Sequence, residues 1–115
     1  MTIILPMCPV GINNAYGFTF KGGVYKNSKI KVWEENCLKE LLLWRKQINK
    51  KNYVDFKLTF YFEKSIKGYN DIDGRLKFVL DMMQKGGFFE DDSFIEHIDL
   101  YKKFDKESQR IEIEL

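Results

Sequence analysis

Several residues from which functional sites are commonly built are scarce in this chain of 115 residues. It has one histidine, His97, and two cysteines, Cys8 and Cys37. A zinc site made of imidazoles needs more than one histidine, and the two cysteines have no metal-ligand spacing and are too few for a disulfide framework. We therefore expect two reduced thiols, as in a cytoplasmic protein.

Long hydrophobic stretches are also missing. No apolar run approaches the roughly 20 residues of a membrane-spanning helix, and Pro6 ends the apolar run at residues 3–5 before it is long enough for a signal peptide. The sequence contains no repeat, linker or low-complexity tract. Its 44% apolar and 16% aromatic residues are typical of a globular protein, and we expect one domain over residues 1–115.

The net charge is only +2, but the charges are unevenly distributed. Residues 1–67 hold twelve Lys and Arg against five Asp and Glu, whereas residues 68–115 hold seven against twelve. A basic cluster in the first part surrounds a predicted hairpin and the start of a predicted helix, and could meet a polyanion. Its members are Lys21, Lys26, Lys29 and Lys31. The alternative is an ordinary solvated, lysine-rich surface.

The periodicity of apolar residues predicts an α+β fold. Strands are expected at residues 3–5, 54–62, 94–103 and 111–115, with a hairpin over residues 18–26 and a turn at residues 105–108. Apolar residues recur every three or four positions from residue 28 to about residue 50, and again from residue 73 to Gly86. Both stretches are therefore predicted helices. The order indicates two helices packed on a mixed, largely antiparallel β-sheet.

The most informative stretch is acidic and surrounds the second predicted helix. Asp71 and Asp73 are separated by one residue, Lys77 follows four residues later, and Asp81 four residues after that. Asp73 is in the position of an N-cap. The apolar stripe Leu76, Val79, Leu80 and Met83 leads to Gly86-Gly87, which supplies a left-handed helix stop, and the acidic triplet Glu90-Asp91-Asp92 follows.

This pattern suits a divalent metal. A helix of three turns spans only roughly 18 Å, so a returning strand could bring Asp92 close to Asp71 and Asp73. Converging carboxylates repel one another unless a cation lies between them, and Mg²⁺ prefers oxygen ligands. An EF-hand is excluded, because Arg75 and Leu76 stand where an oxygen ligand and a glycine are required. The alternative is structural: a helix cap, a Lys77–Asp81 surface ion pair and a solvated acidic turn.

The same residues resemble a known family, the RusA-type Holliday junction resolvases. Its signature has the form D-x-D-N-x-x-K, a helix continuing to an aspartate, then a glycine, an aromatic residue and paired aspartates. The matching residues here are Asp71-Ile72-Asp73-Gly74-Arg75-Leu76-Lys77, Asp81, and Gly87-Phe88-Phe89-Glu90-Asp91-Asp92. Two further segments are similar, namely Leu5-Pro6-Met7-Cys8-Pro9 with Asn13-Asn14, and Val24-Tyr25-Lys26-Asn27-Ser28. Gly74 departs from the family's usual Asn.

The resemblance implies an Mg²⁺-dependent endodeoxyribonuclease, with Mn²⁺ able to substitute. Position by position, Asp71, Asp73 and Asp92 would hold the metal, Asp91 would be a spare ligand or supporting partner, and Lys77 would be catalytic. DNA contacts are expected from the basic cluster at Lys21, Lys26, Lys29 and Lys31, and from Arg75 and Lys102.

The implied substrate is branched DNA, a four-way junction that is cut by paired symmetric nicks. Two equivalent cuts favour a homodimer, and the helical faces bearing Leu42, Leu43 or Phe78 offer apolar surface for its interface. The expected location is the cytoplasm of a bacterial or phage-infected cell, with no membrane partner. Two alternatives are a non-catalytic DNA-structure binding protein and, less well suited to 115 residues, a D-x-D nucleotide-sugar transferase.

Overall fold

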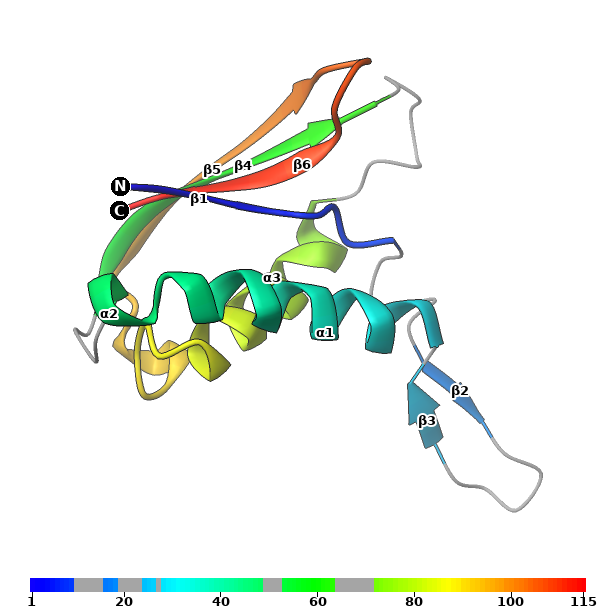
Figure 1. The fold of residues 1–115 in the computed structure, drawn as a ribbon, viewed down its shortest axis with the longest axis horizontal. Coiled ribbons are helices and arrows are strands. Elements are labelled where there is room, and N and C mark those ends of the chain that lie inside the picture. Colours follow the sequence, from blue (N-terminus) through cyan, green and yellow to red (C-terminus); the bar gives the residue numbers. More distant parts are fainter. Residues whose placement is uncertain (10–15, 19–23, 27, 49–52, 64–71) are drawn as a thin grey trace.

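The computed structural model describes residues 1–9, 16–18, 24–26, 28–48, 53–63 and 72–115, with only the backbone at 16–18 and 24–26 (Figure 1). Its elements in chain order are β1 (Thr2–Leu5), β2 (Tyr16–Phe18), β3 (Val24–Lys26), α1 (Ser28–Leu43), α2 (Arg45–Ile48), β4 (Asp55–Phe62), α3 (Asp73–Lys85), the 3₁₀ turn η2 (Asp92–Phe94), β5 (His97–Phe104) and β6 (Arg110–Glu114).

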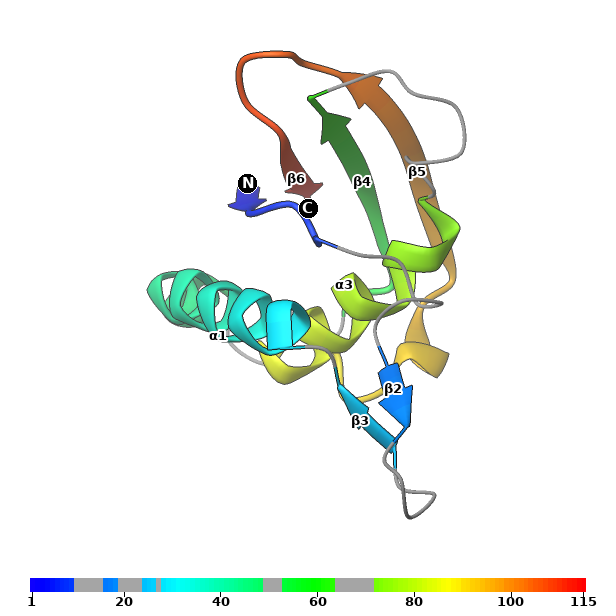
Figure 2. The same ribbon diagram turned by 90° about the vertical axis from the view of Figure 1, so that its right-hand side faces the viewer.

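Four strands form a mixed sheet in the order β1-β6-β4-β5. β6 is antiparallel to both β1 and β4, whereas β4 and β5 are parallel and joined through α3. β2 and β3 pair separately as an antiparallel hairpin. The helices α1 and α3 lie on the same side of the sheet in both ribbon views (Figures 1 and 2). The predicted α+β class, with helices packed on a mixed and largely antiparallel sheet, is confirmed.

The core lies between the sheet and these helices. On β4, every second side chain from Phe56 to Phe62 is buried, as the alternation of apolar residues predicts. The neighbouring strands add side chains of the same face, namely Ile3, Leu5, Ile111 and Ile113. Val54, which we expected to belong to this face, precedes the strand and is exposed.

The first long helix is confirmed but is shorter than predicted. Ile30, Trp33, Cys37 and Leu41 are buried at the predicted spacing. The helix ends at Leu43, and α2 follows after Trp44. The break coincides with a tightening of the hydrogen bonding, because the Trp44 N–H donates to the Leu41 carbonyl three residues back, at 3.1 Å.

Two expectations about the second half are wrong. β5 does not begin at Phe94 but at His97, because residues 92–94 form a 3₁₀ turn first. Phe78 is not surplus apolar surface: its side chain is only 2% exposed, and it belongs to the buried side of α3 with Val79, Met82 and Met83. Leu42 and Leu43 are exposed, as expected.

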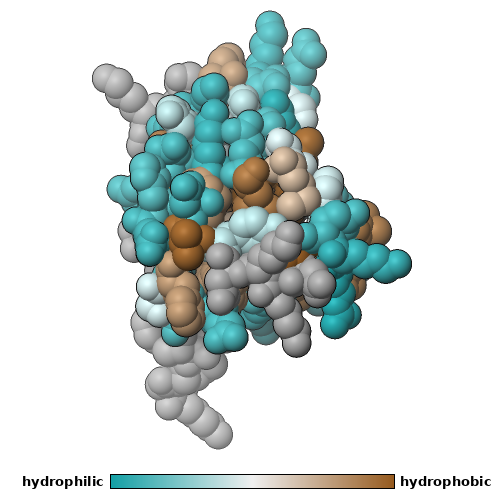
Figure 3. Space-filling view, turned by 90° about the vertical axis from the view of Figure 1, so that its left-hand side faces the viewer, coloured by the Kyte–Doolittle hydropathy of each residue, from teal (hydrophilic) through white to brown (hydrophobic). Residues whose placement is uncertain are grey.

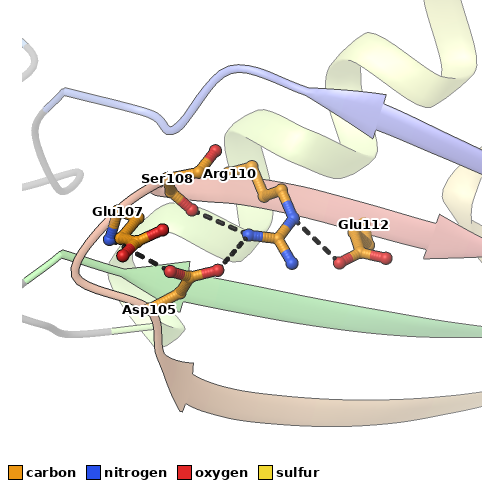
Figure 4. A network of polar contacts seen from close by, with 5 residues as sticks. All are labelled: Asp105, Glu107, Ser108, Arg110 and Glu112. Atoms are coloured by element: carbon orange, nitrogen blue, oxygen red, sulfur yellow. Dashed lines mark hydrogen bonds and ion pairs between the residues drawn. The ribbon is translucent and has the colours of Figure 1, made fainter.

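The connection from β5 to β6 passes the end of β4 and is held by an ionic network (Figure 4). Arg110 donates to the carboxylate of Asp105 at 2.8 Å, to the Ser108 carbonyl at 2.8 Å and to Glu112 at 3.0 Å. This hydrogen bonding from Arg110 lowers the pKa of Asp105. The guanidinium also stacks 4.0 Å from the ring centre of Tyr61, so one side chain joins the turn to two strands.

Both cysteines are buried, and neither is part of a disulfide. Burial, with smaller contributions from Cys8 and Glu34, raises the pKa of Cys37 to about 12. In the part of the chain that the structure describes, no helix combines the length and apolar character needed to cross a membrane.

Candidate active site

One acidic residue of the candidate site, Asp73, lies in the first turn of α3. Asp73 is its first residue, and Ile72 rather than Asp73 is the N-cap, so the predicted capping role of Asp73 is wrong. Ile72 already has helical backbone angles (φ −79°, ψ −31°), and its carbonyl accepts from the N–H of Arg75 and Leu76. Among the residues that the structure describes, no side chain caps this end. The Asp73 carboxylate therefore lies inside the first turn, where the helix dipole favours a negative charge.

Burial of one side of α3 leaves another side for the polar residues. Phe78, Val79, Met82 and Met83 are buried, and the predicted stripe residues Leu76 and Leu80 are half-buried beside them. Asp73 and Lys77 are exposed and Asp81 is half-buried. These three residues are spaced four apart, so they follow one another along the helix at roughly 6 Å per step. No Lys77–Asp81 ion pair forms between these described side chains.

The predicted glycine stop ends α3 as a Schellman motif. Gly87 has φ +92°, its N–H donates to the Gln84 carbonyl, and the Phe88 N–H donates to the Met83 carbonyl. The chain then enters the core. Phe88 and Phe89 are buried, and Phe89 stacks on Phe56 with ring centres 6.3 Å apart. This anchorage turns the acidic triplet back toward α3.

Asp91 and Asp92 follow the buried aromatic pair after one exposed residue, Glu90. The Ser93 N–H donates to Asp91 Oδ1 at 3.1 Å, which lowers the pKa of Asp91 and caps η2. A hydrogen bond between the two carboxyl side chains raises the pKa of Asp92. Asp81 raises the same pKa further and Lys77 lowers it, so Asp92 lies within electrostatic reach of both residues. η2 accordingly packs against α3.

Asp92 thus lies within electrostatic reach of Lys77 and Asp81, and Asp73 stands one helical turn before Lys77. Asp71 lies outside the described residues. Within the described residues, no group of three or more potential metal ligands comes together. The available donors are carboxylate oxygens, and Mg²⁺ sites often use one or two carboxylates completed by water and substrate phosphate. Asp73 and Asp92 fit such a site.

Two predicted DNA-contacting cations meet at one aromatic ring. Arg75 Cζ lies 5.3 Å from the ring centre of Phe62, and Lys102 Nζ lies 5.9 Å from it. Phe62 is buried at the end of β4, next to the first turn of α3. Lys102 extends from β5 on the helix-facing side of the sheet, because it pairs in register with the inward-facing Phe60.

The other predicted cations belong to the N-terminal half. Lys29 and Lys31 are exposed in the first turn of α1. Lys26 ends β3, although its side chain lies outside the described part of the chain, as does the whole of Lys21.

Sequence reasoning missed a long-range contact of the site. Arg75 Nε donates to the carbonyl of Cys8 at 3.1 Å, across 67 positions of sequence. No periodicity or motif in the sequence predicts a backbone acceptor that is 67 positions away. The role of Phe62 as a shared platform for two cations was equally hidden, because its alternation predicted only burial.

Comparison with known proteins gives one family match. The model of the family described as endodeoxyribonuclease RusA matches residues 6–115, which is almost the whole chain. A search of curated proteins finds no match.

Proposed function

The chain belongs to the endodeoxyribonuclease RusA family, and on that premise we propose that it resolves four-way DNA junctions by paired symmetric nicks, with Mg²⁺ held by Asp71, Asp73 and Asp92. The observation that supports this proposal is the return of the chain after Gly87, after which η2 packs against α3 and Asp92 lies within electrostatic reach of Lys77. Lys77 and Asp92, which are 15 residues apart in sequence, are thereby exposed close to the helix that begins with Asp73.

A divalent cation bound to these carboxylates neutralises phosphate charge and makes a coordinated water more acidic. The protein supplies the remaining functions. The exposed ammonium of Lys77 stabilises the negative charge that develops on the phosphate during cleavage. Asp91 is held by the Ser93 N–H and adjoins Asp92 in the chain, so it serves as the supporting acid of that ligand. Mn²⁺, which also accepts oxygen ligands, substitutes for Mg²⁺ in this proposal.

DNA affinity requires cations away from these acids, because carboxylates repel phosphate. Lys29 and Lys31 occupy the first turn of α1, which contains no acidic residue. Lysines are unfavourable there for the helix, whose N-terminus is already positive, but the combination attracts an anion. We assign the DNA backbone path to these lysines, Arg75 and Lys102, together with the hairpin lysines Lys21 and Lys26.

Paired cutting further implies a homodimer, since two equivalent sites engaged in one binding event avoid release of a half-cut junction. Leu42 and Leu43 are 61% and 75% exposed at the end of α1, and they are our candidates for the interface. Hydrophobic patches stand among hydrophilic side chains at this end of the molecule (Figure 3). Junction DNA in a bacterial or phage-infected cell is found in the cytoplasm, so we expect the protein there. Light scattering at micromolar concentration tests the dimer, and a monomer mass would contradict it.

The test of the activity uses a synthetic four-way junction, Mg²⁺ or Mn²⁺, and the variants Asp73→Asn and Asp92→Asn. Each variant should cleave about 10²-fold more slowly or worse, as the loss of an electrostatic contact in the transition state predicts. Junction binding in EDTA should persist or tighten, because a negative charge facing phosphate has been removed. The matched control is Asp99→Asn, an exposed aspartate on β5 that contacts His97 and lies on the sheet face away from the helices.

Equal cleavage by all variants, or loss of folding in the two site variants alone, would contradict the assignment. Binding of the junction by the wild-type protein without cleavage in either metal would instead favour a non-catalytic DNA-structure binding protein.

A further inference from the structure

The N-terminal segment Pro6–Cys8 lies between the two long helices and is held by a side chain from each. Trp33 Nε1 of α1 donates to the Pro6 carbonyl at 2.7 Å. Arg75 Nε of α3 donates to the Cys8 carbonyl at 3.1 Å. Trp33 and Cys8 are both buried, and both hydrogen bonds are partly buried. The segment therefore connects α1 to the beginning of α3.

Arg75 has a second anchor in the sheet. Its guanidinium carbon lies 5.3 Å from the ring centre of Phe62, within the range of a cation–π contact. Phe62 is only 4% exposed and is the last residue of β4. A single half-buried side chain thus joins the N-terminal segment, the end of β4 and the first turn of α3.

The N-cap residue of this first turn does little to hold it in place. Ile72 has no side-chain oxygen that could accept from the backbone N–H groups of the turn, and among the described residues no side chain caps it. Arg75 stands two residues after Asp73 and two before Lys77. Its tertiary contacts therefore hold the turn that carries one proposed metal ligand and leads to the proposed catalytic lysine.

We propose that Arg75 is a positioning residue, which holds Asp73 and Lys77 in register with Asp92 through the Cys8 carbonyl and the Phe62 ring. The inference rests on the proposed metal-dependent function and deepens it, because it assigns the Pro6–Cys8 segment a role in positioning the proposed site residues. A positive charge alone cannot make both the hydrogen bond to the Cys8 carbonyl and the contact with the Phe62 ring. A guanidinium presents a fixed Nε–H and a flat face together, whereas an ammonium at the end of a lysine chain offers neither in that geometry.

The experiment compares Arg75→Lys, which keeps the charge, with Arg75→Met, which keeps most of the stem. Three properties are measured: Mn²⁺ binding without DNA by calorimetry, hydrogen exchange of the residue 73–77 amides, and junction binding in EDTA. Lys102→Met is the matched control, because it removes a cation from the same ring without a bond to the N-terminal segment. Trp33→Phe removes the donor to Pro6 while keeping an aromatic ring.

Both Arg75 variants should weaken Mn²⁺ binding about tenfold and speed exchange at residues 73–77, as the loss of a charge-assisted hydrogen bond predicts. Arg75→Lys should leave junction affinity in EDTA within about twofold, because the phosphate-facing charge is kept. Lys102→Met should do the reverse, with weaker junction binding and unchanged Mn²⁺ affinity. Trp33→Phe should shift Mn²⁺ binding in the same direction as Arg75→Lys.

Wild-type Mn²⁺ affinity and exchange in Arg75→Lys would overturn the positioning role, since charge would then suffice. If the Arg75 variants do not fold, Trp33→Phe decides, and unchanged Mn²⁺ affinity in that variant would overturn the proposal. Failure of the proposed function is a separate result: a wild-type protein that binds Mn²⁺ but leaves junctions uncut would refute the nuclease assignment, while the metal-binding and exchange measurements would still test Arg75.

Discussion

The turn after α3 can be tested by adding one methyl group at each of its two glycines. Gly87 has φ +92°, and a Cβ built there would have no other atom within 4 Å. Gly87→Ala therefore adds backbone strain without a steric clash. A left-handed conformation costs a non-glycine residue about 1–2 kcal/mol, and the reduced entropy of the unfolded chain returns about 0.4–1 kcal/mol. We expect a net loss of roughly 1 kcal/mol in the free energy of unfolding.

Gly86→Ala should lower the stability through a steric clash rather than through backbone strain. Gly86 has ordinary helical angles (φ −77°, ψ −7°), but its Cβ would lie 2.9 Å from Leu41 Cδ1 and 3.2 Å from the Met82 carbonyl oxygen. Leu41 belongs to α1 and is buried, so its side chain must shift to make room for the added methyl group. Overpacking of this kind costs about 1–3 kcal/mol. The two alanine variants thus share a turn and a direction of effect but differ in cause.

Urea unfolding of both variants, alone and combined with Leu41→Ala, separates these causes. The Gly86→Ala and Leu41→Ala effects should be coupled by at least about 0.5 kcal/mol, because the truncation relieves the clash, whereas Gly87→Ala should be additive with it. Gly87→Asn should recover part of the loss, since asparagine tolerates positive φ better than alanine. Wild-type stability in Gly87→Ala, or coupling of that variant to Leu41, would refute the reasoning.

Three further outcomes are expected. Lys77→Met should slow junction cleavage about 10²-fold or more while leaving stability within about 0.5 kcal/mol, because the side chain is exposed; full turnover in a metal-saturated assay would exclude its catalytic role. A chromogenic disulfide reagent at pH 8 should label neither Cys8 nor Cys37 in the native protein and both after denaturation, because both are buried and the pKa of Cys37 is raised to about 12; rapid native labelling would contradict this burial. Finally, the pKa of Asp105 is lowered beside Arg110. The contribution of this carboxylate to stability is therefore fully present above the ordinary aspartate pKa of about 3.9. That contribution is lost as pH falls through the lower, folded-state pKa. The stability difference between the wild type and Asp105→Asn in urea unfolding should accordingly be largest near neutral pH and shrink below pH 4, and a difference that does not change with pH would show that the ion pair contributes nothing.

The sequence by itself determined the features that depend on neighbouring residues. Alternation along residues 54–62 identified β4 and its buried face, because side chains of a strand point alternately to its two sides. The spacing of Ile30, Trp33, Cys37 and Leu41 identified α1, and Gly86-Gly87 identified the end of α3. The order of the acidic residues and Lys77 was enough to indicate the family that the comparison then confirmed.

Tertiary structure alone decided the features that depend on distant residues. Phe78 lies outside the apolar stripe that the helix pattern predicted, yet it is buried on α3, because other segments of the folded chain cover this side of the helix. Arg75 was predicted to contact DNA from its charge, yet its hydrogen bond to Cys8 comes from a segment 67 positions away. The physical reason is the separation along the chain over which each kind of interaction acts. Propensity, alternation and capping act over a few residues, whereas acceptors and packed faces are supplied by segments that only the folded chain brings together.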